Sequence, residues 1–213
     1  MSSFQEINVR YSGSTPEEQV GILAISGQKI IFEYDPAWIK KGLELSPHHL
    51  PITRSKFQFE RSKLYNGLPG LFADSLPDGW GMLIMDRFFL QNGIRKNDIS
   101  SIDRLAYLGM NAMGALSYRP MLRKDLESTE AVQIGVIAQE ALKLYEGDIE
   151  DASRLLAKIG GSPGGARPKG LIGISSCGTK FVSGLNELPA GYSHWLIKFS
   201  GAMPTQQRTL GPY

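Results

Sequence analysis

Hydrophobic and polar positions alternate in three short segments near the N-terminus, at residues 6–11, 20–25 and 29–34. A period of two, β-branched and aromatic side chains, and turns that contain glycine predict antiparallel strands joined as hairpins. We expect the third strand to end at Asp35-Pro36, because proline has no backbone N–H to donate to a neighbouring strand. Residues 43–72 contain several Pro and Gly positions and are predicted to be irregular.

The clearest helical pattern begins near Leu76 and ends at Asn92-Gly93. Asp74 or Ser75 can cap its first turn through a side-chain oxygen. Four apolar residues at helical spacing predict one buried face: Trp80, Leu83, Ile84 and Phe88. Weaker patterns predict further helices near residues 98–108, 128–146 and 149–159, with a strand at 115–121.

The pattern changes after residue 159. A glycine-rich segment, residues 160–169, leads into three apolar segments that we expect to be strands, at residues 170–175, 180–183 and 194–199. The order is therefore glycine segment, strand, turn, strand, loop, strand.

Composition narrows the class of protein. The chain of 213 residues is 42% hydrophobic and 21% charged, which is ordinary for a globular protein and excludes disordered and fibrous classes. No apolar run approaches the roughly 20 residues that span a bilayer, and the first residues carry no secretory signal pattern. The single cysteine, Cys177, excludes an internal disulfide framework. We therefore expect a cytoplasmic protein without membrane contact.

Charge is distributed unevenly. Residues 151–213 carry seven Lys and Arg against two acids, whereas residues 1–150 carry 16 against 19. A basic, acid-poor C-terminal third suits a partner that bears phosphate, although chance asymmetry is an equally simple explanation.

The glycine-rich segment is the first candidate for chemistry. Its glycines allow backbone N–H groups to approach a polyphosphate, and Arg167 and Lys169 add positive charge. It is not a Walker A loop, because Pro168 and Gly170 flank the lysine where that motif needs Gly and Ser or Thr. A glycine loop that leads into a β-hairpin is how protein kinases cover ATP phosphates. The alternative is an ordinary turn.

Lys198 is the second candidate. It lies in the apolar run Trp195-Leu-Ile-Lys198-Phe, where we expect a buried strand that would normally exclude charge. In a kinase N-lobe, a lysine on the third strand contacts the nucleotide phosphates. The alternative is an edge-strand lysine that reaches water.

These segments together resemble the HipA-like serine/threonine protein kinases, toxins of bacterial type II toxin–antitoxin pairs. The most specific likeness is Ser162-Pro-Gly-Gly-Ala-Arg-Pro-Lys169 with the strand His194–Lys198. Two segments, Leu71–Asp78 and Leu108–Leu116, resemble the N-terminal subdomain of that family. The resemblance extends from about residue 6 to residue 213.

The resemblance implies roles for particular residues. Ser162 corresponds to the serine that family members autophosphorylate, and a phosphate there would repel the nucleotide phosphates. The implied nucleotide-binding residues are Gly164, Gly165, Ala166, Arg167, Pro168, Lys169 and Lys198. The implied cofactors are ATP and Mg²⁺. The implied partners are a HipB-like helix-turn-helix antitoxin, which binds DNA so that DNA contact is only indirect, and a protein substrate.

The sequence departs from the family pattern after Lys198. Family members supply a catalytic Asp, an Asn and a metal-binding Asp from a helical C-lobe, but Glu187 is the only acid after Asp151 here. We therefore expect no catalytic residue and no metal ligand in this chain, whose Mg²⁺ would be held by the full-length family protein.

We predict an α+β protein with two parts. Residues 1–125 would form a β-sheet-plus-helix subdomain, and residues 126–213 a helical connection and the beginning of a kinase-like N-lobe, with the C-lobe absent. The first hypothesis is the N-terminal portion of a kinase that phosphorylates a protein with Mg-ATP and is inactive alone. The alternative is a non-catalytic binding module that engages the antitoxin or a separate kinase subunit. An RNA-binding fold is a third reading, but the chain lacks the aromatic-rich basic strands of that type.

Overall fold

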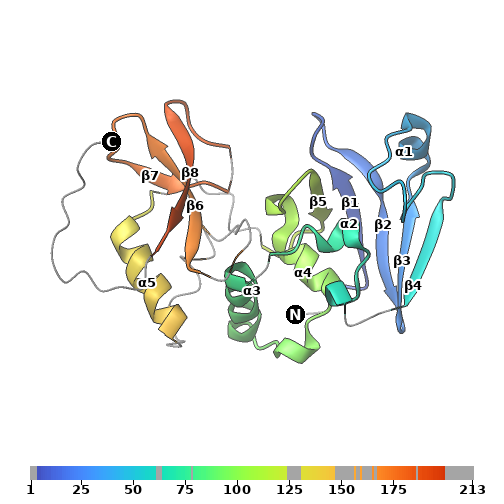
Figure 1. The fold of residues 1–213 in the computed structure, drawn as a ribbon, viewed down its shortest axis with the longest axis horizontal. Coiled ribbons are helices and arrows are strands. Elements are labelled where there is room, and N and C mark those ends of the chain that lie inside the picture. The colour runs from blue at the N-terminus through green and yellow to red at the C-terminus, as the bar shows by residue number, and fades with distance from the viewer. Residues whose placement is uncertain are drawn as a thin grey trace.

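The computed structural model describes residues 4–60, 64–77, 79–123, 131–146, 156, 159, 165, 167–185 and 187–199. They form a larger unit built on a five-stranded sheet and a smaller unit built on a three-stranded sheet, with helix α3 between the two (Figure 1). Both sheets are antiparallel. The predicted α+β class is therefore confirmed.

The larger sheet has the strand order β4-β3-β2-β1-β5. Its strands are β1 (Glu6–Tyr11), β2 (Glu18–Ser26), β3 (Lys29–Tyr34), β4 (Lys56–Glu60) and β5 (Leu116–Arg119). The three N-terminal strands and β5 agree with the predicted segments. Val9 of β1 pairs with Tyr118 of β5, so the sheet is completed by a strand that lies far away in the sequence.

Alternation along these strands places one set of side chains on a buried face. In β1, Ile7 and Val9 are buried while Glu6 and Asn8 are exposed. The buried face packs against α2 (Gly70–Ala73) and α4 (Ser101–Leu108), which cover the side of the sheet turned toward the smaller unit (Figure 1).

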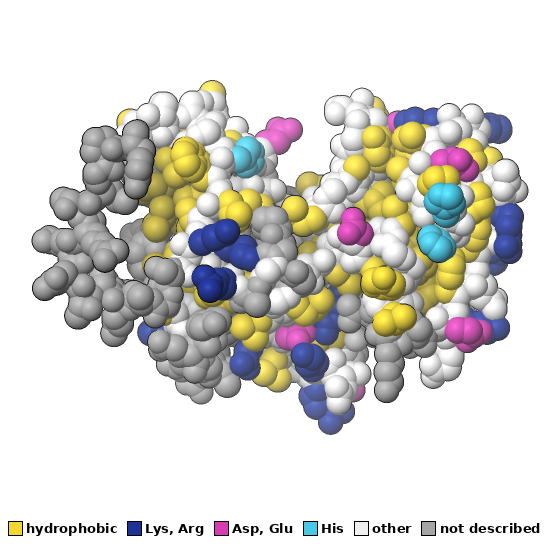
Figure 2. Space-filling model, viewed as in Figure 1, with side chains coloured by type: hydrophobic (Ala, Val, Ile, Leu, Met, Phe, Trp, Pro, Cys, Tyr) yellow, Lys and Arg dark blue, Asp and Glu magenta, His cyan; other side chains and the backbone are white. Residues whose placement is uncertain are grey.

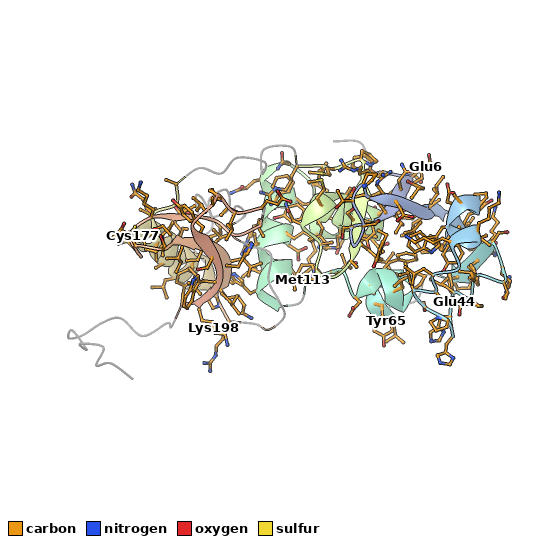
Figure 3. The ribbon with its side chains drawn as sticks, turned by 90° about the horizontal axis from the view of Figure 1, so that it is seen from above. Glu6, Glu44, Tyr65, Met113, Cys177 and Lys198 are labelled. Atoms are coloured by element: carbon orange, nitrogen blue, oxygen red, sulfur yellow. The ribbon has the colours of Figure 1, made fainter. Side chains whose placement is uncertain are left out.

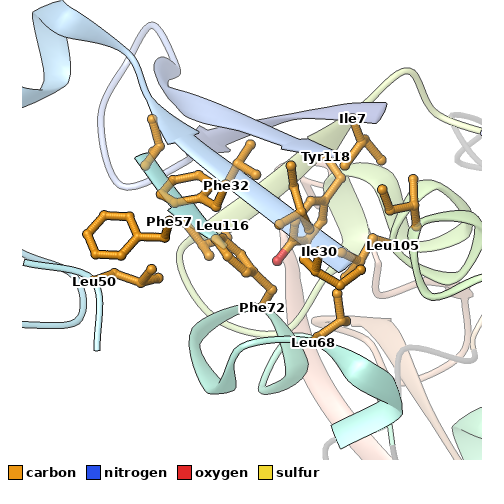
Figure 4. Packing of buried hydrophobic residues seen from close by; sticks show 14 of the residues in the cluster. Ile7, Ile30, Phe32, Leu50, Phe57, Leu68, Phe72, Leu105, Leu116 and Tyr118 are labelled. Carbon is orange, nitrogen blue, oxygen red and sulfur yellow. The ribbon is translucent and has the colours of Figure 1, made fainter. Parts of the chain in front are cut away.

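Aromatic and aliphatic residues pack together in this core, as Figure 4 shows for the aromatic residues Phe32, Phe57, Phe72 and Tyr118. Phe32 lies 4.9 Å from Phe72 between ring centroids. The hydroxyl of Tyr118 shares a hydrogen bond of 2.7 Å with Ser75, which satisfies two polar groups inside the core. Burial raises the pKa of Tyr118, so this hydroxyl stays neutral.

The region between β3 and α3 is more regular than the sequence predicted. The strand ends at Tyr34, directly before Asp35-Pro36 as expected. Helix α1 (Pro36–Lys41) starts there because the Asp35 carboxylate accepts a hydrogen bond of 2.8 Å from the Ala37 N–H. The prediction of irregular structure over residues 43–72 was wrong in part. This stretch contains β4, the 3₁₀ turn η1 (Leu64–Gly67) and α2. Strand β4 forms because pairing with β3 buries Phe57, a long-range contact that local composition does not reveal.

Helix α3 (Gly79–Gln91) starts later than predicted. Asp74 follows α2, and Ser75 bonds Tyr118, so neither residue caps α3. The predicted end is confirmed, because Gly93 adopts a φ of 77°.

The four residues predicted to form the apolar face of α3 all pack in hydrophobic cores, but they divide between two cores. Trp80, Leu83 and Ile84 pack in the core of the smaller unit. Phe88 packs instead around Met85 and Phe89, against α4. The helix therefore belongs structurally to both units.

The connection from α3 to β5 passes through η2 (Lys96–Asp98), α4 and η3 (Gly109–Asn111). A reciprocal pair of hydrogen bonds between Ser100 and Asp103 caps α4. The ion pair of 2.6 Å between Arg104 and Asp86 then ties α4 to α3.

The smaller unit contains α5 (Ile134–Glu146), β6 (Lys169–Ser175), β7 (Phe181–Ser183) and β8 (Tyr192–Lys198), with the strand order β7-β6-β8. All three predicted strands are confirmed. The predicted helix at residues 149–159 is described only at Leu156 and Ile159, both helical and buried. The predicted boundary between residues 125 and 126 lies outside the described residues.

Candidate functional site

The glycine-rich segment is described at Gly165 and from Arg167 onward. Three residues to which the resemblance assigns roles, Ser162, Gly164 and Ala166, lie outside the described residues. Their roles stay predictions. The candidate site that follows is built from Gly165, Arg167, Pro168, Lys169 and Lys198.

Gly165 adopts a backbone conformation that favours glycine, with a φ of 91°. A larger residue would also clash at this position, because a Cβ added to Gly165 would lie 2.6 Å from the ammonium nitrogen of Lys169. The Lys169 side chain therefore folds back over Gly165. Backbone and cation thus come close together at the point where the chain enters β6.

Lys169 and Lys198 are direct cross-strand partners in the β6–β8 register. Residues directly opposite each other in an antiparallel pair project from the same face of the sheet, so both side chains leave the sheet on one face. Lys169 is 4% exposed, and Lys198 is exposed. Two cationic side chains therefore lie at directly opposite positions of β6 and β8.

Arg167 adds a third cation beside them and is exposed. Among the residues that the structure describes, neither Arg167 nor Lys198 forms an ion pair. Pro168 is buried between Arg167 and Lys169, and its carbonyl accepts a hydrogen bond of 2.9 Å from the Phe199 N–H. Lys and Arg side chains gather over β6 and β8 on the face seen in Figure 2.

Lys198 does not lie in a buried strand, contrary to the expectation from its apolar neighbours. In the described part of the chain β8 is an edge strand, and Trp195 and Leu196 are 54% and 42% exposed. Figure 3 shows Lys198 at the outer surface of the smaller unit. The sequence pattern misled because an apolar run indicates a strand but does not say how many neighbours that strand has.

Trp80 is a member of the site that the sequence did not reveal. Its backbone N–H donates to the Gly165 carbonyl at 3.2 Å, and its indole Nε1–H donates to the Lys169 carbonyl at 2.8 Å. The indole bond joins residues 89 positions apart in the sequence. No local spacing could have indicated this contact, since Trp80 reads simply as an apolar position on a helix.

Other features of the described chain do not enlarge this site. A surface hollow of about 570 Å³ lies over β1–β3, and another of about 610 Å³ lies beside β7 and α5, but neither includes a candidate site residue. Within the described ranges no three His, Cys, Asp or Glu side chains gather as metal ligands would. No described helix is both long and apolar enough to cross a membrane.

Cys177 lies in the turn between β6 and β7, at the end of the smaller unit far from the larger sheet (Figure 3). Its sulfur forms hydrogen bonds with the Ser175 hydroxyl at 3.3 Å and the Thr179 hydroxyl at 3.1 Å. These hydrogen bonds, the one with Ser175 most of all, lower the pKa of the thiol to about 7. Its position in a turn agrees with the sequence pattern and places it apart from the cations of β6 and β8.

The comparisons with known proteins concern mainly the larger unit. Residues 14–119 match the family model described as the HipA N-terminal domain. No curated protein matches the chain. The matched range runs from just before β2 to the end of β5 and contains both segments in which the sequence resembled the family's N-terminal subdomain. The glycine segment and β6–β8 lie outside it. The match shows that the chain carries a HipA-like N-terminal portion.

Proposed function

We propose that residues 1–213 are the N-terminal portion of a HipA-like serine/threonine protein kinase and bind the phosphates of Mg-ATP through the glycine segment, Lys169 and Lys198. The observation that carries this proposal is the direct cross-strand pairing of Lys169 with Lys198 beside a glycine of positive φ. The family match to the larger unit supports the toxin–antitoxin context.

The topology of the smaller unit supports a nucleotide site. A glycine segment precedes β6, a tight turn joins β6 to β7, and a longer loop leads to β8 with its lysine. Protein kinases likewise use a glycine-rich loop to cover the ATP phosphates and a lysine on the third strand to contact them.

Electrostatics support the same ligand. Arg167, Lys169 and Lys198 bring three positively charged side chains to the start of β6 and the paired end of β8. A triphosphate carries several negative charges and can accept charge-assisted hydrogen bonds from such cations.

Phosphate transfer needs groups that these residues do not supply. Carboxylates must hold Mg²⁺ and orient the attacking hydroxyl. No Asp or Glu lies between Lys198 and Tyr213. We therefore expect residues 1–213 to bind nucleotide without transferring phosphate, and the transfer to a protein substrate to require further carboxylates. The family resemblance also implies Ser162 as the site of inhibitory autophosphorylation and a helix-turn-helix antitoxin as the partner.

Titration calorimetry with Mg-ATP on purified residues 1–213 tests the proposal. Lys198→Met should weaken affinity by about tenfold, the loss expected for one charge-assisted hydrogen bond. Lys180→Met is a matched control, because Lys180 is an exposed lysine beside β7 in the same sheet. No binding by the unaltered chain, or equal losses in both variants, would contradict the nucleotide site and favour the non-catalytic binding module.

A further inference from the structure

We propose that Trp80 is a positioning residue for the candidate phosphate site, holding Gly165 and Lys169 in the positions that receive the nucleotide. This inference rests on the proposed nucleotide-binding function. It assigns to a residue of α3, in the part of the chain that matches the HipA N-terminal domain, a role in a site built outside that match.

Two donors of one residue hold both ends of the segment. The Trp80 backbone N–H bonds the Gly165 carbonyl, and the Trp80 indole N–H bonds the Lys169 carbonyl. The two carbonyls lie on either side of Arg167 and Pro168. The two hydrogen bonds hold Gly165 and the backbone of Lys169 against Trp80 of α3.

Loss of either hydrogen bond would lower the stability of the folded protein. Trp80 is 1% exposed, so its indole N–H has no access to water, and a buried donor left unpaired costs about 1–3 kcal/mol. The backbone N–H of Trp80 lies in the first turn of α3, where helix N–H groups have no partner within the helix. The Gly165 carbonyl therefore supplies an acceptor that the first turn of α3 lacks, and the same hydrogen bond holds Gly165 against the helix.

The position of Trp80 is itself held from two sides. Its indole packs in a core with Ile84, Ile137 and Ile172 of the smaller unit. Further along α3, Asp86 pairs with Arg104, which is 6% exposed, and joins the helix to α4 beneath the larger sheet. The glycine segment is thus oriented by an element anchored in the larger unit.

Trp80 contributes by orientation, since no donor of Trp80 remains to bind phosphate once both carbonyls are bonded. A segment fixed in advance loses less conformational freedom when ligand binds, and this raises affinity without a new contact. Loosening the segment should therefore weaken nucleotide binding while the cations themselves stay in place.

The test removes the indole donor and keeps an aromatic side chain at position 80. Trp80→Phe keeps an aromatic ring in the core, and replacement of Trp80 by benzothienylalanine keeps the full shape with sulfur in place of the N–H. Trp195→Phe is the matched control, because the exposed Trp195 indole donates to Ser193 on β8 at 2.9 Å. Circular dichroism identifies folded variants, and the benzothienylalanine protein carries the test if the phenylalanine variant does not fold.

Two readouts separate positioning from the nucleotide site. Without nucleotide, amide hydrogen exchange over residues 167–171 should become at least threefold faster in the Trp80 variants and stay unchanged in Trp195→Phe. With the non-hydrolysable probe Mg-imido-ATP, the dissociation constant should rise about three- to tenfold in the Trp80 variants alone, the range expected for a lost hydrogen bond.

The outcomes discriminate between the two claims. Faster exchange with weaker binding supports the positioning role. Unchanged exchange and unchanged affinity in a folded Trp80 variant overturn it, even if the unaltered chain binds the probe well. A third outcome is faster exchange in the Trp80 variants while the unaltered chain binds no probe. The proposed nucleotide site would then be wrong, and so would the role of Trp80 in nucleotide binding. The faster exchange would still show that Trp80 restrains the backbone over residues 167–171.

Discussion

The larger and smaller units bury their hydrophobic residues in different ways. The larger unit closes its own core, with Phe32, Phe72 and Tyr118 fully buried between the five-stranded sheet and its helices. The smaller unit draws Trp80 and Ile84 from α3 into its core and leaves Trp195 and Leu196 exposed at the edge strand β8. A self-contained core supports a rigid platform, whereas a shared core makes the smaller unit depend on its neighbour.

The same difference appears in how the sheet edges are protected. On the larger sheet, Lys56 of the edge strand β4 pairs with Glu33 at 3.2 Å, and Lys29 lies near Glu60. Charged edge residues discourage pairing with other chains. On β8 the exposed side chains near the middle of the strand are aromatic and aliphatic. The candidate site therefore lies on the less protected sheet, as expected if regions of lower stability carry function.

The largest effect is expected from opening the core of the larger unit. Phe32→Ala should cost about 3–5 kcal/mol of unfolding free energy, because the lost ring leaves a cavity among close-packed aromatics. Urea denaturation followed by circular dichroism measures it. Ile22→Ala, at an exposed position of the neighbouring strand, should change stability by less than about 0.5 kcal/mol. Similar losses in the two variants would contradict the self-contained core.

Two variants on α3 should destabilise different units of the protein. Ile84 faces the core of the smaller unit and Met85 the cluster with α4, and both are buried. Alanine at either position should cost about 2–4 kcal/mol. Hydrogen exchange should then accelerate mainly in β6–β8 for Ile84→Ala and mainly in α4 for Met85→Ala. The same exchange pattern in both variants would show that the two cores open together and would remove the distinction.

The smallest effect concerns the turn of Cys177, a probe that exists only in the smaller unit. Hydrogen bonding to Ser175 and Thr179 lowers the pKa of the Cys177 thiol to about 7. About half of the Cys177 side chains are therefore in the thiolate form near neutral pH. Alkylation by iodoacetamide should accelerate through pH 7 and level off above about pH 8, since the thiolate is the reactive form. Ser175→Ala should move the midpoint upward. A midpoint near that of a free cysteine, about 8.5, would contradict the hydrogen-bonded turn.

Sequence reasoning succeeded where the physical signal is local. Alternation at residues 6–11 and 29–34 fixes which side chains can share a face, so β1 and β3 were predictable. It failed at β4, which becomes a strand by pairing with β3, and at the start of α3. For the site, Lys169 was recognised by its glycine neighbours, while the burial of Lys198 was overestimated because edge and central strands share the same apolar pattern.

The amino-acid sequence by itself determined the α+β class, the strand segments other than β4, the HipA-like resemblance and the cations near the glycine segment, because each depends on neighbouring residues. Only the tertiary structure decided that Lys169 and Lys198 face each other, that β8 forms an edge, and that Trp80 holds the segment between Gly165 and Lys169. These contacts join residues roughly 30 to 90 positions apart. Pairing at that distance depends on how whole elements pack, and local periodicity carries no record of it.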